Sequence, residues 1–142
     1  KECKIYPSTK KILNKLKENF LLFIITNQPD VARKKNSKKN VIEINRYLKN
    51  KLPIKKIYTC YCDNNKCKYR KPNIGMLKDL SKKYKIDLIK SFVIGDRWKD
   101  IEAGKRAKCK TIFIERNYSE NLKSKPNYLI KNISEIKKIF KF

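Results

Sequence analysis

Short runs of consecutive apolar residues, each followed by a segment with helical periodicity, constrain the fold of this chain most strongly. One run covers residues 21–25 and is followed by polar residues, and a second lies in the segment 91–94, where Ser91 precedes three apolar residues and Gly95 and Asp96 follow. Continuous apolarity over so few residues is typical of strands that are buried on both faces, as in a parallel sheet. Further strands are predicted at residues 56–60 and 111–114, and the tail at 127–142 predicts a short strand and a final helix.

Helical segments are predicted between these strands. Pro7 and Ser8 open the first helix, with Ser8 as the expected cap, and Ser37 is the expected cap of the second. Residues 27–36 form a polar loop between them, and further helices are predicted at about residues 74–84 and 99–107. This alternation predicts an α/β fold, namely one domain over residues 1–142 with a Rossmann-like parallel sheet, helices on both faces and no cap domain.

Composition limits the partners that the chain is expected to have. The formal net charge is +25, but only 6 of the 38 basic residues are arginine, and lysine is spread along the whole length. A nucleic-acid surface would favour arginine and concentrate its charge. We therefore expect a solvated lysine-rich surface, with no nucleic-acid binding beyond non-specific charge attraction. No apolar run approaches the roughly 20 residues of a membrane span, and no signal-peptide core is present. We therefore expect a cytoplasmic protein without a membrane partner. We also expect it to be a monomer.

The sequence contains no histidine. This absence excludes histidine general bases, the Ser-His-Asp and Cys-His nucleophile systems, and histidine metal ligands. Any catalysis must therefore use carboxylates, lysine, arginine, hydroxyls or thiols.

Polar residues at two predicted strand and loop ends are candidates for binding an anion, because ligands of parallel sheets bind beyond the carboxyl ends of the strands. Thr26 and Asn27 follow the first apolar run. A hydroxyl and the N–H groups of such a turn can hold a phosphate oxygen, although these residue types also simply cap and turn chains. Arg70 and Lys71 lead into a predicted helix and suit an anion, or they are two more surface cations of a basic protein.

Two carboxylates follow the apolar run at residues 91–94. Asp96 leaves this strand, and Asp100 enters the next helix four residues later. Both can point into one crevice, where hard oxygen ligands suit Mg²⁺. The alternative is that Asp96 caps the helix and Asp100 lies on the surface, and the sequence leaves both interpretations open.

Together these segments resemble motifs two, three and four of the haloacid dehalogenase superfamily. The motifs are a threonine after a strand, Arg-Lys-Pro before a helix, and Gly-Asp-x-x-x-Asp after a buried strand. Residues 25–33 are similar to a segment of the subfamily IIIA phosphatases that act on D-glycero-D-manno-heptose 1,7-bisphosphate and histidinol phosphate. The resemblance implies a haloacid-dehalogenase-like fold and Mg²⁺-dependent hydrolysis of a small phosphomonoester, with a heptose bisphosphate of carbohydrate metabolism as the expected substrate. Tyr69–Pro72 with Gly75 and Met76 also resembles the polynucleotide 3′-phosphatases, which is the alternative.

The same resemblance implies roles for individual residues. Thr26 would hold the transferring phosphoryl group, and Lys71 would neutralise charge between the phosphate and the nucleophile. Asp96 would bind Mg²⁺, with Asp100 supporting the metal site. Substrate contacts are expected from Asn27, Arg33, Arg70 and Arg97.

The first motif of the superfamily does not occur in the sequence. Members carry Asp-x-Asp-Gly-Thr after a central first strand, with the first Asp as nucleophile and the second as general acid–base, whereas no Asp precedes Asp30 here. Hydrolysis through an aspartyl-phosphate needs that nucleophile. We therefore expect an N-terminally truncated chain, with a gap in the sheet between the strands at 21–25 and 91–94. The alternative is a catalytically inactive relative.

Three of the five cysteines, Cys60, Cys62 and Cys67, fall within eight residues. This loop resembles the zinc loop of the heptose-bisphosphate branch, which implies a candidate zinc site. A structural zinc needs four ligands, and Asp63 or a water is the expected fourth. The alternative is a loop of reduced thiols, because an odd number of cysteines argues against a disulfide framework. Cys109 is expected to be a packing residue.

Overall fold

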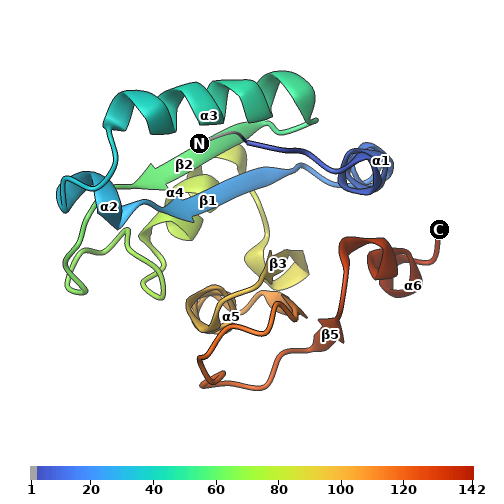
Figure 1. The fold of residues 1–142 in the computed structure, drawn as a ribbon. Coiled ribbons are helices and arrows are strands. Elements are labelled where there is room, and N and C mark those ends of the chain that lie inside the picture. The colour runs from blue at the N-terminus through green and yellow to red at the C-terminus, as the bar shows by residue number, and fades with distance from the viewer. Residues whose placement is uncertain (1–2) are drawn as a thin grey trace. The chain divides into compact units, whose positions relative to one another are not determined.

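The structure, a computed structural model, describes residues 3–142 and confirms the α/β class. The chain divides into two compact units, of which the first comprises the residues up to Asp63 together with 133–142, and the second comprises residues 64–132. Each unit has its own parallel sheet, with the order β1-β2 in the first and β3-β4-β5 in the second (Figure 1).

The first unit is built on two parallel strands. β1 (Phe23–Asn27) pairs with β2 (Lys56–Cys60) along their whole length, and the long helix α3 (Lys38–Lys51) connects them and runs alongside them (Figure 1). The ring of Phe20 packs edge-on against that of Phe140, with 5.2 Å between their centroids. The other helices of this unit are α1 (Pro7–Leu16), α2 (Pro29–Ala32), the 3₁₀ helix η2 (Ile133–Glu135) and α6 (Ile136–Phe140).

The strand β1 is less buried than its apolar run predicts. All five of its residues are half-buried, and Leu21 just before it is 58% exposed. β1 belongs to a two-stranded sheet, so it is an edge strand, and it is not enclosed as a central parallel strand would be. The prediction of a strand buried on both faces is therefore wrong here.

The helix starts of the first unit show where local prediction succeeds and fails. Ser37 caps α3, because its hydroxyl accepts the N–H of Asn40 at 3.0 Å, as predicted. Ser8 does not cap α1, because the helix already begins at Pro7, whose fixed φ and missing N–H suit the first helical position. Pro29 likewise starts the short helix α2 inside a segment that was predicted to be a loop.

The second unit packs the helix α5 against a three-stranded parallel sheet. Ile101 of α5 and Ile112 of β4 are fully buried in its core. α5 can approach the sheet closely at Gly104, because a Cβ atom there would lie 2.6 Å from the Cγ2 atom of Thr111. The elements of this unit are α4 (Gly75–Tyr84), the 3₁₀ helix η1 (Leu88–Lys90), β3 (Phe92–Gly95), α5 (Trp98–Arg106), β4 (Lys110–Ile114) and β5 (Tyr128–Ile130).

The two strands that the sequence places on either side of a missing central strand belong to different sheets. β1 is paired with β2, and β3 is paired with β4. The two strands are therefore not paired with each other, and the gap between them stays a prediction. A single domain over residues 1–142 stays a prediction.

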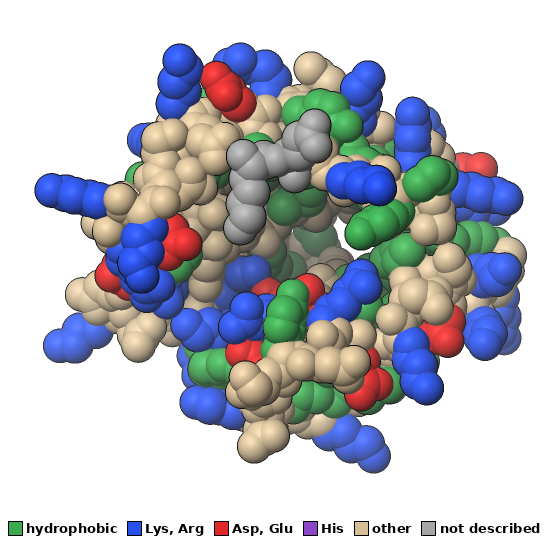
Figure 2. Space-filling model, in the orientation of Figure 1, with side chains coloured by type: hydrophobic (Ala, Val, Ile, Leu, Met, Phe, Trp, Pro, Cys, Tyr) green, Lys and Arg blue, Asp and Glu red, His purple; other side chains and the backbone are tan. Residues whose placement is uncertain are grey.

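Two surface properties bear on the expected partners. Among residues 3–142, no helix combines the length and the apolar composition that crossing a membrane requires. Figure 2 shows Lys and Arg side chains scattered over the face that it draws rather than gathered on one element.

Candidate active site

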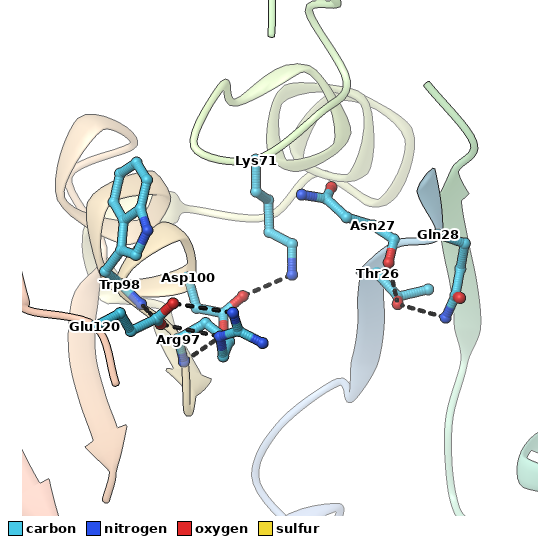
Figure 3. A network of polar contacts seen from close by, with 8 residues as sticks. All are labelled: Thr26, Asn27, Gln28, Lys71, Arg97, Trp98, Asp100 and Glu120. Carbon is cyan, nitrogen blue, oxygen red and sulfur yellow. Dashed lines mark hydrogen bonds and ion pairs between the residues drawn. The ribbon is translucent and has the colours of Figure 1, made fainter. Parts of the chain in front are cut away.

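A buried ion pair in the second unit joins two of the predicted site residues. The Lys71 Nζ atom lies 2.6 Å from Asp100 Oδ1, and the two side chains are only 11% and 13% exposed (Figure 3). Lys71 lies in the loop before α4, and Asp100 lies in the first turn of α5. Removing one partner of such a pair would leave an uncompensated charge in a poorly solvated place, so each residue depends on the other.

Asp100 also closes the turn that leads from β3 into α5. Its Oδ2 atom accepts the Arg97 N–H at 3.1 Å, and its own N–H donates to the Arg97 carbonyl at 3.1 Å. Gly95 makes room for this arrangement, because a Cβ atom there would overlap the Asp100 side chain. The interpretation in which Asp96 caps the helix and Asp100 lies on the surface is therefore wrong, because Asp100 is buried and does the capping.

Asp96 directly follows β3 and is half-buried. The Tyr118 hydroxyl donates a long hydrogen bond, of 3.3 Å, to its Oδ2 atom. Both Asp100 oxygens already accept hydrogen bonds, so the two carboxylates are not equivalent. Mg²⁺ typically takes one or two carboxylates and keeps several waters. The half-buried Asp96 carboxylate fits what Mg²⁺ requires of a ligand, and the assignment of Asp96 as ligand with Asp100 in support stays a prediction.

Arg97, a predicted substrate contact, is bound by Glu120. Its Nε and Nη2 atoms each donate to a Glu120 oxygen at 2.9 Å (Figure 3), and its guanidinium lies 4.6 Å from the centre of the Tyr118 ring. This hydrogen bonding raises the pKa of Arg97 and lowers the pKa of Glu120, so both remain charged over the ordinary pH range. Arg97 therefore has a structural partner that the sequence did not indicate.

Arg70 is buried in the loop before α4, where only 6% of the residue is exposed. Its Nε atom donates to Asn65 Oδ1 at 3.2 Å. The neighbouring Asn73 side chain donates to the carbonyls of Asn65 and Cys67, both at 2.9 Å. These contacts give Arg70 a place in the folding of the loop in addition to its predicted role in binding substrate.

In the first unit, Thr26 and Asn27 are the last two residues of β1, which begins and ends two residues later than the apolar run predicts. The Gln28 side chain donates to Thr26 Oγ1 at 3.2 Å (Figure 3), and the Gln28 N–H continues the strand pairing by donating to the Cys60 carbonyl at 2.7 Å. The Thr26 hydroxyl donates a long hydrogen bond, of 3.5 Å, to the Asn27 carbonyl. Gln28 thus orients the hydroxyl so that Thr26 can donate its hydrogen.

Arg33 ends α2 and is paired with Asp63. Its Nε and Nη2 atoms lie 2.7 and 2.6 Å from Asp63 Oδ1, and Asp30 lies 3.7 Å from its Nη1 atom. The hydrogen bond with Asp63 raises the pKa of Arg33. Both partners are exposed, so this pair links two loops of the first unit at its surface.

The cysteine loop brings its three sulfur atoms within 4.8 Å of one another. Cys62 and Cys67 are disulfide-bonded, while Cys60 is reduced and buried. The expectation of reduced thiols is therefore wrong for these two residues. With two sulfurs oxidised and Asp63 bound to Arg33, the donor set does not fit a four-ligand zinc site. Cys109 is a packing residue as predicted, and burial raises the pKa of its thiol to about 11.

Two residues of this site, Tyr118 and Glu120, were not found from the sequence. They lie between β4 and β5, beyond the carboxyl end of β4. Ligands of parallel sheets bind beyond the carboxyl ends of the strands, which is why Thr26 and Asp96 were predicted. The same reasoning, applied to the strand at residues 110–114, indicates this segment as well.

Comparison with known proteins gives consistent matches. The model of the family described as polynucleotide kinase 3 phosphatase matches residues 4–133. The chain is 31% identical over 139 residues to D-glycero-beta-D-manno-heptose-1,7-bisphosphate 7-phosphatase of Pasteurella multocida, which covers 86% of this chain and 74% of that protein. It is 33% identical over 134 residues to D-glycero-alpha-D-manno-heptose-1,7-bisphosphate 7-phosphatase of Campylobacter jejuni, covering 89% and 74%.

Solved structures share the fold. The D,D-heptose 1,7-bisphosphate phosphatase of B. bronchiseptica, complexed with magnesium and phosphate, superposes with a TM-score of 0.77 at 20% identity, covering 95% of this chain and 82% of that one. A phosphatase of the haloacid dehalogenase superfamily from Thermococcus onnurineus gives a TM-score of 0.67 at 19% identity, covering 96% and 58%. The predicted haloacid-dehalogenase-like fold is confirmed.

Proposed function

Because the chain belongs to the family described as polynucleotide kinase 3 phosphatase, within the haloacid dehalogenase superfamily of phosphatases, we propose that it forms the phosphate- and magnesium-binding part of a sugar-bisphosphate phosphatase. The observation that carries this proposal is the buried Lys71–Asp100 pair next to Asp96. Two of the similar proteins are named heptose-1,7-bisphosphate 7-phosphatases, which favours a sugar bisphosphate as the substrate.

Lys71 and Asp96 would have different tasks in this site. The ion pair with Asp100 holds the Lys71 ammonium in position, so that its charge is fixed where a phosphate oxygen can meet it. Asp96 would bind Mg²⁺ directly. When bound, Mg²⁺ polarises the phosphoryl group and neutralises charge that develops during its transfer.

Thr26 would hold a phosphoryl oxygen. Its Oγ1 atom accepts a hydrogen bond from Gln28, and its own hydrogen makes a long bond to the Asn27 carbonyl that a phosphoryl oxygen could replace. A preorganised donor of this kind stabilises a transferring phosphoryl group without reorganisation during the reaction. Asn27, Arg33, Arg70 and Arg97 remain candidates for contacts with the rest of the substrate.

The proposed reaction needs a nucleophile that these 142 residues do not provide at the family's position. A carboxylate oxygen would attack phosphorus, the bond from phosphorus to the leaving oxygen would break, and a general acid would protonate that oxygen. Water would then hydrolyse the aspartyl-phosphate to free phosphate. We propose that an Asp-x-Asp motif encoded in the same reading frame supplies both the nucleophile and the general acid. We further propose that the protein is cytoplasmic and acts as a monomer.

The experiment is phosphate release by the product of the full reading frame, supplied with Mg²⁺, from a panel of phosphoesters. The panel contains a heptose 1,7-bisphosphate, other sugar bisphosphates, histidinol phosphate and a 3′-phosphorylated oligonucleotide. We expect the highest kcat/KM for a sugar bisphosphate. A folded protein that carries the motif and releases phosphate from none of these compounds would overturn the proposal.

A polynucleotide 3′-phosphatase is the second candidate, because the matching family model carries that description and the net charge is +25. The Lys and Arg side chains on the face drawn in Figure 2 are scattered, so that face shows no concentrated basic patch for nucleic acid. The dependence on salt distinguishes the two candidate functions. A protein that neutralises several backbone phosphates of a nucleic acid binds it much more weakly as the ionic strength rises. Preference for the oligonucleotide, with a steep salt dependence of KM, would favour this second candidate.

A further inference from the structure

We propose that Glu120 is a positioning residue that holds the turn from Asp96 to Asp100 in the geometry needed to bind Mg²⁺. The proposal rests on the proposed function, because it concerns the same site. Glu120 belongs to the segment of residues 115–127 between β4 and β5, which we call the β4–β5 segment.

Both ends of the β4–β5 segment are fixed to the sheet. At its start the Glu115 N–H donates to the Ile130 carbonyl at 2.9 Å. At its end the Asn127 side-chain oxygen accepts from the N–H and the hydroxyl of Thr111, at 2.8 and 3.1 Å. The Asn127 N–H donates in return to the Thr111 hydroxyl at 3.1 Å, and Thr111 is fully buried. The segment is therefore held at both ends by the strands that it connects.

The middle of the segment is attached to α5. The Ser124 hydroxyl donates to Glu102 Oε2 at 2.6 Å, and this bond lowers the pKa of Glu102. The Lys123 ammonium lies 4.0 Å from the centre of the Trp98 ring, within the range of a cation–π contact. Glu120 is thus presented to the start of α5 by a backbone that is restrained on both sides of it.

Glu120 binds the turn through three hydrogen bonds. Its carboxylate accepts from Arg97 Nε and Nη2 at 2.9 Å and from the Trp98 N–H at 3.0 Å. Trp98 is the first residue of α5, where a negative charge also interacts favourably with the helix dipole. One carboxylate therefore holds both the side chain of Arg97 and the peptide that follows it.

The restraint passes from Arg97 to the site. The Arg97 N–H donates to Asp100 Oδ2, while Asp100 Oδ1 pairs with Lys71. Asp96, the proposed Mg²⁺ ligand, is the residue just before Arg97, so the backbone that Glu120 fixes also sets where the Asp96 carboxylate points. Glu120 acts through these residues, because its own oxygens are already occupied by three donors.

The test uses the product of the full reading frame and compares three variants of it, namely Glu120→Ala, Glu120→Gln and the control Glu115→Gln. Glutamine keeps an oxygen that can accept from the Trp98 N–H but loses the charge and the second acceptor. Glu115 is an exposed residue at the start of the same segment, so its variant makes the same charge change outside this network. The readouts are hydrogen exchange of the Trp98 amide and the Mg²⁺ dissociation constant, obtained by NMR titration with the metal alone.

We expect Glu120→Ala to speed exchange of the Trp98 amide about tenfold. We also expect it to raise the Mg²⁺ dissociation constant about tenfold, the lower end of the effect of removing a direct partner of a metal ligand, because Glu120 acts through Arg97. Glu120→Gln should retain most of the amide protection while losing part of the Mg²⁺ affinity, and Glu115→Gln should match the parent in both. Should the alanine variant fail to fold, the glutamine variant carries the comparison.

Equal Mg²⁺ affinity in the parent, Glu120→Gln and Glu120→Ala proteins would overturn the positioning role, even if amide exchange changed. Neither readout depends on turnover, so failure of this proposal is distinguishable from failure of the proposed function. A protein that binds Mg²⁺ at Asp96 with the expected dependence on Glu120, yet cleaves no phosphoester, would contradict only the latter.

Discussion

The two units of the molecule differ in the burial of the ion pair that joins their predicted site residues. In the second unit Lys71 and Asp100 form an ion pair whose side chains are 11% and 13% exposed, whereas in the first unit the pair of Arg33 with Asp63 is 40% and 41% exposed. Exposed pairs are screened by water and stabilise little, while buried pairs fix the positions of their members. The difference indicates that the second unit carries the preorganised part of the site.

Close packing follows the same division. All three glycines of the chain lie in the second unit, and a Cβ atom at any of them would overlap a neighbouring residue. In the first unit the strand that ends in Thr26 is half-buried along its whole length. The part of the proposed site with the least tolerance for change is therefore the turn from Gly95 to Asp100.

The largest expected effect comes from breaking the buried pair. Lys71→Met leaves the Asp100 carboxylate buried and unpaired, so we expect the free energy of unfolding of the second unit to fall by about 3–5 kcal/mol. Urea denaturation followed by the fluorescence of Trp98, the only tryptophan, measures this unit. Arg33→Met is the matched variant of the first unit and should leave its urea midpoint, measured by circular dichroism, almost unchanged. An equal loss of stability in the Lys71→Met and Arg33→Met variants would contradict the difference between the two units.

A smaller loss is expected from Gly95→Ala. The added methyl group would overlap the Asp100 side chain, which must then move away from the Arg97 N–H that it caps. We expect the free energy of unfolding to fall by about 1–3 kcal/mol, as for other overpacked sites. Unchanged stability, together with an unchanged NMR position of the Arg97 amide, would show that the turn is more tolerant than its packing indicates.

The two serines at helix starts in the first unit provide a third test. Ser37→Ala removes the cap of α3, and we expect a loss of about 1 kcal/mol in the free energy of unfolding. Ser8→Ala should cause no loss, because Ser8 lies inside α1 rather than at its cap. Denaturation monitored by circular dichroism compares the two variants. A larger loss in the free energy of unfolding for Ser8→Ala would indicate that Ser8 caps α1, as the sequence predicts.

The smallest expected effect is a dependence of stability on pH. Hydrogen bonds from Arg97 to Glu120 and from Ser124 to Glu102 lower the pKa of both carboxyl groups in the folded state. Their contribution is present above the ordinary value of 4.5 and is lost as the pH falls through the lower folded-state values. We expect Glu120→Gln to flatten the fall of the urea midpoint of the second unit between neutral and acid pH. An unchanged slope would contradict this assignment.

Much of the fold could be predicted because it depends on local patterns. The apolar runs located β2 at its observed bounds and placed β3 and β4 to within one residue at each end. The burial of β1 was predicted wrongly, because burial depends on how many strands flank it and not on its own composition. For the same reason the sequence could not tell whether Asp96 or Asp100 would be buried.

The site was predicted where motifs were contiguous and missed where distant residues meet. Asp96 and Asp100 share one turn, so their proximity follows from spacing alone. Glu120 reaches Arg97 from 23 residues away, and Asp63 reaches Arg33 from 30 residues away. Such pairs depend on how β4 and the loops are folded, and a sequence rich in lysine offers every carboxylate many partners. The oxidised state of Cys62 likewise could not be inferred from an odd number of cysteines.

The central claim is that Asp96 binds the metal of a phosphatase site, and its most direct test uses two aspartates of the second unit. Phosphate release from a sugar bisphosphate is measured against Mg²⁺ concentration for the product of the full reading frame and for its Asp96→Asn and Asp79→Asn variants. Asp79 is an exposed residue of α4 and provides the matched charge change. We expect Asp96→Asn to abolish Mg²⁺-dependent release and Asp79→Asn to leave it unchanged. Full activity of Asp96→Asn with the same dependence on Mg²⁺ would contradict the account.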